Sequence, residues 1–485
     1  MLTLLALVLL RTAWLCDDAY ISFRVVDNVL HGYGLRWNIA ERVQVYTHPL
    51  WLLLLIPVNG LAGEPYYSTL LCSMLLTLGA AYLLLLQAAH RWAVLAIGLL
   101  LFYAKGFVDY ATSGLENPLA YLLLAAFSVR YLRPPDRRGG QHLLRLSLLA
   151  ALAMVNRFDA AVLVLPPLLH ALWQARSRRA LLQLAAGMLP LIAWLLFALA
   201  YYGTVIPNTA HAKLLAAGIT HRTLAGKGIA CLSNTLHWDP LTAAAVIVAV
   251  SAALLSPIRR WLGFGLLAGL GYIIWVGGDF MSGRFVAPLF VIAAAILATL
   301  LPAAASRRSM ALAGAAMVLG LAAHYPNPLH GSDYGHLAQQ LANWRDGDIA
   351  DERCFYYSAT GLLAERQPHE WQLQGEALRA GGPAVIVAGN VGLLGYYAGP
   401  AVHIIDRAGL CDPLLARLPA TDAVSFRIGH LDRQLPGGYL DSIRSGENRL
   451  VDAALAARYD TLLLLCRAPL WSAARWRAIV RNTAA

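Results

Sequence analysis

Two adjacent carboxylates, Asp17 and Asp18, directly follow the first apolar run of the chain. Charged groups at a lipid boundary are costly unless water, a cation or hydrogen-bond donors compensate. The pair is therefore either a helix cap at a membrane boundary or a reactive site. A carboxylate can take a proton from a hydroxyl and stabilise a positive charge that develops beside it, and a like-charged neighbour raises the pKa of one member of such a pair.

Cationic and polar side chains elsewhere in the chain have the chemistry to hold a phosphate. The candidates are Arg24, His48, Asn208, His211, Lys213 and Arg284. Two further acids, Glu116 and Asp279, are candidates for contacts with hydroxyl groups. Ion pairs between Arg24 and Asp27, and between Arg284 and Asp279, are the structural alternative, and Arg157 is expected to pair with Asp159.

A cofactor is not indicated by the sequence. The six cysteines form no CxxC pair, which argues against a thiolate metal site. The clustered carboxylates are compatible with a bound divalent cation. The C-terminal part has three cysteines, two of which could form a disulfide.

The composition indicates which elements must position these residues. The 485 residues are 59% hydrophobic and only 13% charged, with a mean hydropathy of +0.56. Soluble domains carry about 25% charged residues, so most of this chain is expected to meet lipid. Apolar runs near the length of a membrane-spanning helix predict about eleven spans. They are 2–16, 67–89, 92–108, 118–132, 142–156, 160–175, 180–200, 240–256, 261–277, 285–303 and 309–324.

The net charge of +11 is concentrated in short arginine-bearing breaks between these runs. Such breaks are typical of cytoplasmic loops, and they place the N-terminus inside and the carboxylate pair outside. Nucleic acid is not an expected partner. The apolar segment 49–60 is too short to span, and counting it as a span would put the arginines outside, so we expect an interfacial helix there.

The chain is expected to have two domains. Residues 1–324 form an α-helical polytopic membrane domain with outer-face loops, and residues 325–485 form an extracytoplasmic soluble α/β domain. Strand candidates in the second are 384–388, 402–405 and 461–465. The segment 389–392, Gly-Asn-Val-Gly, is interpreted as a strand-to-helix turn, because GxxG alone is a weak nucleotide-binding signal.

Several stretches of the chain, in order, resemble one enzyme family. They are 17–24, 31–35 with Asn38, 41–43, 46–51, 112–116, 202–203 with 207–209 and Lys213, 278–280 with 283–285, 395–397, and 405–410 with 412–413. Together they resemble polyprenyl-phosphate-dependent glycosyltransferases of the GT-C fold, and within these the terminal arabinofuranosyltransferases. The likeness covers most of the chain.

The resemblance implies that one of the two aspartates is the catalytic base, with Asp17 narrowly favoured, and that Glu116 is a second acid near the sugar. It implies a decaprenyl-phospho-arabinofuranose donor and an extracytoplasmic acceptor, either a cell-surface or cell-wall glycan or a surface protein such as type IV pilin. The expected location is a bacterial inner membrane, with the site and the C-terminal domain on the periplasmic side.

Three other functions remain open at this point. The same fold could transfer a hexose such as mannose. A transporter would carry charges within its spans and internal repeats, whereas here most charges lie between the spans and no clear repeat is present. A non-enzymatic role in surface assembly or motility is the third.

Overall fold

The computed structural model describes residues 1–133, 141–215, 218–301, 306–323, 349–422 and 426–484. The chain divides into two compact units, each built from three segments. The first unit comprises Met1–Cys16, Glu64–Leu191 and His221–Arg366. The second comprises Asp17–Gly63, Ile192–Thr220 and Gln367–Ala485. The expected domain boundary at residues 324 and 325 falls outside the described residues.

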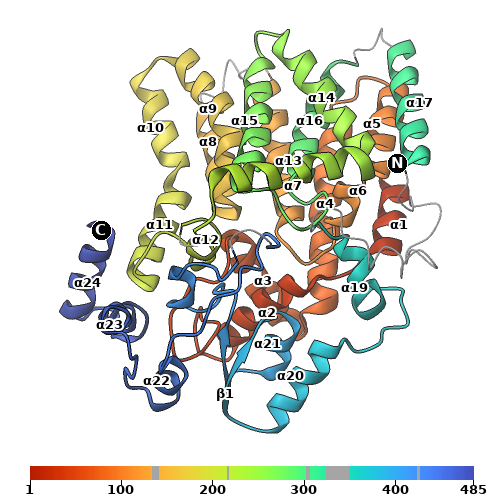
Figure 1. The fold of residues 1–485 in the computed structure, drawn as a ribbon. Coiled ribbons are helices and arrows are strands. Elements are labelled where there is room, and N and C mark those ends of the chain that lie inside the picture. Colours follow the sequence, from red (N-terminus) through yellow and green to blue (C-terminus); the bar gives the residue numbers. More distant parts are fainter. Residues whose placement is uncertain (134–140, 216–217, 302–305, 324–348, 423–425, 485) are drawn as a thin grey trace. The chain divides into compact units, whose positions relative to one another are not determined.

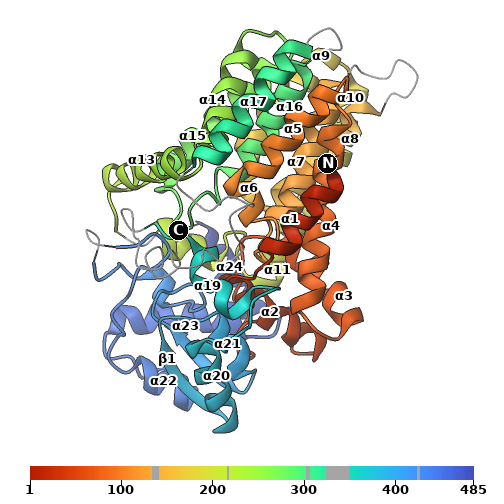
Figure 2. The same ribbon diagram turned by 90° about the vertical axis from the view of Figure 1, so that its right-hand side faces the viewer.

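The first unit is a bundle of helices. Its helices are α1 (Leu2–Thr12), α4 (Tyr66–Leu85), α5 (Arg91–Tyr103), α6 (Lys105–Asp109), α7 (Asn117–Leu132), α8 (His142–Asn156), α9 (Ala161–Ala175), α10 (Arg178–Gly187), α13 (His221–Trp238), α14 (Pro240–Leu254), α15 (Arg260–Val276), α16 (Ala287–Thr299), α17 (Ser306–Ala322) and α19 (Glu352–Thr360). Helices α5, α14, α16 and α17 run side by side along the bundle, while α13 lies across it (Figures 1 and 2). Helix α16 is buried along nearly its whole length and forms the core.

Ten of the eleven predicted membrane spans fall on helices of this bundle, although most helices are short, and the span 180–200 continues from α10 into the second unit. Among the described residues, two helical stretches are long and apolar enough to cross a membrane, Tyr66–Leu85 and Phe158–Ala175. Two pairs pass the same test together but are bent, α10 with α11 (Leu189–Tyr202) by 47° and α13 with α14 by 110°. Two to four spans are thus supported by length and composition, and the number eleven stays a prediction.

The second unit contains a small two-stranded parallel sheet. Strand β1 (Ala384–Ala388) pairs with β2 (Val402–Asp406) from Ala384 opposite Val402 to Ala388 opposite Asp406. Its helices are α2 (Asp17–Leu30), α3 (Pro49–Ala62), most of α11, α12 (Asn208–Ala210), the π-helical turn η2 (His211–Leu215), α20 (Glu370–Ala380), α21 (Leu393–Ala398), the 3-10 turn η3 (Leu415–Arg417), α22 (Tyr439–Ser445), α23 (Ala453–Arg467) and α24 (Ala473–Ala484). Segment 49–60 is helical as expected, and its interfacial position stays a prediction.

Two of the three predicted strands are confirmed, and the third is wrong. Residues 461–465 lie inside α23. Its buried residues Tyr459, Leu462, Leu465 and Cys466 recur at helical spacing, and the Asp452 side chain accepts a hydrogen bond from the Leu455 amide at its start. A short run of leucines does not by itself distinguish a strand from a helix.

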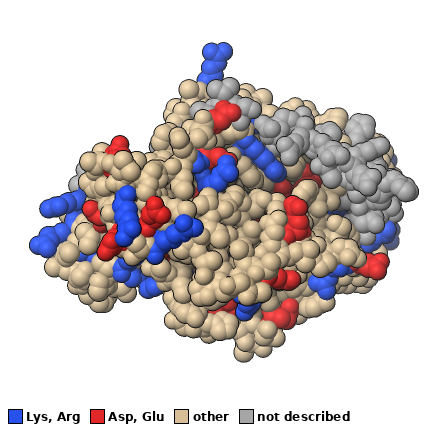
Figure 3. Space-filling view, turned by 60° about the horizontal axis from the view of Figure 1, so that its bottom comes forward, with Lys and Arg blue, Asp and Glu red and all other residues tan. Residues whose placement is uncertain are grey.

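Charged side chains of both signs stand side by side on the face drawn in Figure 3. Although the net charge of the chain is +11, the described residues on this face therefore form no continuous basic patch. The six cysteines, all within the described residues, form no disulfide.

Candidate functional site

Asp17 lies at the start of α2, where its carboxylate caps another helix of the second unit. The Leu393 amide, at the start of α21, donates to Asp17 Oδ1 over 2.7 Å. A Cβ on Gly392 would lie 2.5 Å from Asp17 Oδ2, so only glycine lets the carboxylate come this close. The strand-to-helix turn predicted for residues 389–392 is present before Leu393, and Gly392 in it leaves room for the Asp17 carboxylate.

The environment of Asp17 favours its neutral form. Burial raises the pKa of this carboxyl to about 7, and the charge of Asp18 also raises it, while the amides of Leu393 and Gly392 act in the opposite direction. A buried carboxyl beside a second carboxylate is the usual arrangement in which one of two acids keeps its proton. Asp17 is thus suited to sharing a proton with its surroundings near neutral pH, and it has little access to solvent.

Asp18, in contrast, is partly exposed. It belongs to a group of ionisable side chains that we call the Asp18 cluster: Asp17, Asp18, Lys213, Arg427 and His430. Their mutual influence is seen at His430, whose pKa is lowered to about 4 by desolvation and then by Arg427, while Asp18 raises it and Lys213 adds a smaller lowering. One accessible carboxylate and two cationic side chains thus act on the same imidazole.

Arg24 serves the structure of the second unit. Its guanidinium donates to the carbonyls of Trp37 (2.9 Å), Gly395 (2.5 Å) and Val402 (2.7 Å), and it lies 4.2 Å over the Trp37 ring. The side chain is 2% exposed. These donors hold α2 to α21 and β2. The charge of Asp27 acts on Arg24 as well, and the predicted phosphate contact stays a prediction.

Asn208 likewise holds the backbone of a loop, residues 406–413, which follows β2. Its amide group donates to the carbonyls of Gly409, Leu410 and Asp412 at 2.9–3.1 Å. Its oxygen accepts from Arg417 over 3.1 Å. Asn208 therefore holds this loop in place, and its predicted phosphate contact stays a prediction.

Two buried aspartates fix the same loop from within. Asp406 accepts from the amides of Ala408 and Cys411, both at 2.9 Å. Asp412 accepts from two amides that follow it and from the Tyr439 hydroxyl at 2.8 Å. Burial raises the pKa of Asp406 to about 6 and that of Asp412 to about 7. The charge of Asp18 also contributes to raising the pKa of the Cys411 thiol in this loop.

The two predicted histidines have different surroundings. His48 Nε2 lies 2.8 Å from Ser22 Oγ, and both side chains are buried between α2 and α3. For His211, desolvation lowers the pKa to about 4, and Arg417 and Arg458 contribute to this lowering. His211 is therefore uncharged near neutral pH, and it can offer a phosphate a hydrogen bond but no charge.

Glu116, Asp279 and Arg284 belong to the first unit, in a buried ion network. Glu116 is 0% exposed and accepts from Arg157 over 2.7 Å and from Arg284 over 3.2 Å. Arg157 also pairs with Asp159, and Arg284 with Asp279 at 3.5 Å. The expected Arg157–Asp159 and Arg284–Asp279 pairs are both present. Two cations face three carboxylates, so the network offers an anionic ligand no excess positive charge.

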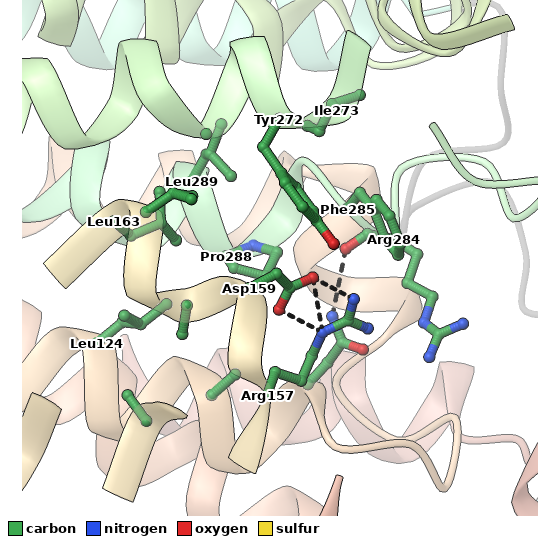
Figure 4. A pocket seen from close by; sticks show the side chains of 16 residues that line it. Leu124, Arg157, Asp159, Leu163, Tyr272, Ile273, Arg284, Phe285, Pro288 and Leu289 are labelled. Atoms are coloured by element: carbon green, nitrogen blue, oxygen red, sulfur yellow. Dashed lines mark hydrogen bonds and ion pairs between the residues drawn. The ribbon is translucent and has the colours of Figure 1, made fainter. Parts of the chain in front are cut away.

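This network forms one wall of a pocket with an empty volume of about 570 Å³, part of it open to solvent. Figure 4 shows Arg157, Asp159 and Arg284 on one side, Leu124, Leu163 and Leu289 on the other, and Ile273 at the top beside Tyr272. The Arg157 guanidinium lies 4.7 Å over the Phe285 ring. The pocket thus presents an apolar surface next to an already paired set of charges.

No protein-family model matches the chain. Its sequence is 29% identical to the terminal β-(1→2)-arabinofuranosyltransferase of Mycobacterium tuberculosis, over 86% of this chain and 80% of that protein. A protein of the same name from Corynebacterium glutamicum is 27% identical over 58% of this chain and 47% of its own length. Among solved structures, ArnT from Cupriavidus metallidurans bound to undecaprenyl phosphate superposes with a TM-score of 0.53 at 15% identity, covering 86% of this chain and 88% of ArnT.

The chain is a membrane glycosyltransferase. The resemblance to terminal arabinofuranosyltransferases is confirmed by the two relatives, and the GT-C fold by the likeness to ArnT.

The predicted site residues of this glycosyltransferase fall into two groups. The second unit contains Asp17, Asp18, Arg24, His48, Asn208, His211 and Lys213, of which Asp17, Asp18 and Lys213 belong to the Asp18 cluster. The first unit contains Glu116, Asp279 and Arg284, which contact one another through Arg284. Among the described residues, no group of three or more His, Cys, Asp or Glu side chains has the arrangement of a metal site.

Sequence reasoning missed two members of the Asp18 cluster, Arg427 and His430. They lie in a non-periodic part of the chain, so no helix or strand pattern placed them. The only signal available was the basic composition of Arg427-Ile-Gly-His430, which begins 14 positions after the recognised 405–413 stretch.

Proposed function

We propose that this glycosyltransferase transfers D-arabinofuranose from a decaprenyl monophosphate to a hydroxyl of an extracytoplasmic acceptor. The observation that carries the proposal is the Asp18 cluster, an accessible carboxylate beside a buried acid and two cations. The sugar follows from the names of the two relatives. A cell-surface glycan and a surface protein such as a type IV pilin are the acceptor classes considered.

Asp18 is assigned the role of base. Its carboxylate accepts the proton of the acceptor hydroxyl while the hydroxyl oxygen forms a bond to the anomeric carbon. The bond from that carbon to the phosphate oxygen breaks, and its electron pair remains on the polyprenyl phosphate. The pKa of Asp17 is raised to about 7, so its carboxyl is mostly protonated and neutral in mildly acidic solution. In that form it does not repel the Asp18 carboxylate.

The leaving phosphate gains negative charge in this step and requires cationic partners. Lys213 and Arg427 are assigned that role, since both lie within electrostatic reach of the groups around Asp18. His211 adds an uncharged imidazole in the same π-helical turn as Lys213. Arg284 and Asp279, which sequence alone offered for donor and sugar contacts, are assigned to the ion network of the first unit.

The pocket of the first unit is assigned a separate role, binding part of the isoprenoid chain. Its leucine and isoleucine wall offers apolar area, and its charges are already paired. ArnT, which shares the fold, was solved with undecaprenyl phosphate. Replacing Leu163 by Trp should fill the pocket and raise the KM for a long-chain donor more than for a short-chain analogue.

The proposal includes location. We place the enzyme in a bacterial inner membrane, with the second unit and the Asp18 cluster on the periplasmic side, as the positive-inside rule predicts. Reporter fusions after residue 62 and within 367–485 should both give the extracytoplasmic signal.

The central experiment supplies the purified enzyme in lipid nanodiscs with decaprenyl-phospho-arabinofuranose or a mannosyl equivalent and candidate acceptors. Turnover is expected with the arabinosyl donor, and Asp18→Asn should reduce kcat by about 10²–10⁴-fold, the range for loss of a general base. Asp27→Asn, on the exposed face of the same helix, is the matched control and should keep full activity.

Two outcomes would overturn parts of this proposal. Preference for the mannosyl donor would replace arabinose by a hexose. Full activity in Asp18→Asn, with loss in Asp17→Asn, would move the base to the buried residue.

A further inference from the structure

The C-terminal hairpin α23–α24 packs on the end of an apolar helix, α11, within the second unit. Helix α11 contains no charged residue, and with α10 it forms one of the bent pairs apolar enough to cross a membrane. Its side chains Ile192 and Leu196 are 44% and 62% exposed. In a membrane enzyme, such side chains face lipid.

Arg475 joins α24 to this helix. Its guanidinium is 0% exposed and donates to the carbonyls of Ala200 (2.8 Å) and Tyr201 (3.0 Å), at the last turn of α11, and to Leu465 in α23 (2.9 Å). These carbonyls lack partners within their own helix. A Cβ on Gly203, directly after α11, would lie 3.1 Å from Leu465 and 3.5 Å from Ile479. The hairpin is therefore fixed at the depth at which α11 ends.

The outward side of the hairpin has the composition of a membrane interface. Trp471 is 77% exposed and Val480 63% exposed, and the Trp471 and Trp476 rings stack with their centroids 6.0 Å apart. Arg477 and Arg481 are exposed next to them. Tryptophan concentrates at both interfaces of a bilayer, and arginines there bind anionic headgroups.

We propose that α24 and the preceding Trp471 form an interfacial anchor that binds anionic phospholipid headgroups at the membrane surface where α11 ends. Two observations favour lipid as the ligand of this surface. The surface continues from the exposed apolar side of α11, and its free charges are positive. The anchor would hold the C-terminal segment, which contributes Arg427 and His430 to the Asp18 cluster, to the bilayer from which the donor comes.

The test uses the full chain in nanodiscs, with a fluorophore attached at Val480→Cys in a Cys72→Ser background. Cys72 is replaced because it is the native cysteine with a part-exposed side chain. Val451→Cys, whose native side chain is 83% exposed in the same unit, is the matched control. Lipids with a nitroxide near the headgroup should quench the label at 480 and leave the label at 451 unaffected.

Arginine variants separate headgroup binding from simple proximity. In nanodiscs containing phosphatidylglycerol, Arg477→Gln and Arg481→Gln should each weaken the docked state by about fivefold, and they should have little effect in phosphatidylcholine alone. Equal quenching at 480 and 451 overturns the proposal. A blue-shifted label at 480 that the nitroxide lipids do not quench also overturns it, because the surface would then be covered by protein, such as a second copy. Transfer activity is not the readout, so this result is independent of the assignment of Asp18.

Discussion

Replacing Asp17 by Asn is expected to stabilise the second unit at alkaline pH and leave it unchanged at acidic pH. The pKa of Asp17 is raised from 3.8 to about 7, mainly by burial. Because the folded-state pKa lies above the unfolded one, the folded protein is most stable below pH 3.8 and loses stability as the pH rises through 7. At 1.36 kcal/mol per unit, the full loss is about 4 kcal/mol.

The asparagine amide has no charge to bury, and its oxygen can still accept from the Leu393 amide. Between about pH 5 and pH 8 the native enzyme should therefore lose about 2–3 kcal/mol relative to the variant. Thermal unfolding of both proteins in the same detergent, scanned at several pH values, measures this as a melting difference that grows by a few °C with pH.

A melting difference that is constant with pH would refute the reasoning, because the carboxyl would then have its ordinary pKa. A native enzyme that gains stability with rising pH relative to Asp17→Asn would refute it as well, since the carboxylate would then be stabilised by its hydrogen bonds more than it is destabilised by burial. Asp27→Asn, exposed on the same helix, should show no such trend.

Three further variants test separate contacts. Arg24→Lys cannot reproduce the donors to Gly395 and Val402, so it should lower the melting temperature by an amount equivalent to about 2–4 kcal/mol, with activity lost in proportion to folded protein. Glu116→Gln removes the carboxylate that Arg157 and Arg284 share and leaves each arginine with one acidic partner, so it should destabilise the first unit by about 2–3 kcal/mol, measured by denaturant titration. Gly392→Ala places a methyl group against the Asp17 carboxylate, and it should cost about 1–3 kcal/mol in the native enzyme, seen in the same melting assay.

The sequence was sufficient for most of the bundle helices, because an apolar run is a local pattern, whereas the catalytic role of the acidic pair stays a prediction. Apolar runs marked nearly every helix of the first unit, and Asp17-Asp18 stood out by position and by resemblance. Helix α13 was missed and assigned to a connection, because its polar residues interrupt the apolar pattern.

The sequence did not show which of Asp17 and Asp18 is buried and which is accessible. Whether Asp17 or Asp18 is buried depends on Gly392 and Leu393, some 375 positions later in the chain. The same holds for Arg24, whose environment is supplied by Gly395 and Val402. In both cases the sequence identified a charged residue of interest. The contacts that bury it come from residues more than 350 positions away, which no local pattern connects to it.

The assembly of the second unit from three distant segments has a consequence for biosynthesis. Asp18 is translated long before the residues that complete its surroundings, because the Asp18 cluster needs Arg427 and His430, and the end of α11 needs Arg475. A chain released by the ribosome before residue 427 would have its apolar helices made and the Asp18 cluster incomplete. Under the proposed function, transfer activity therefore requires translation to pass residue 430.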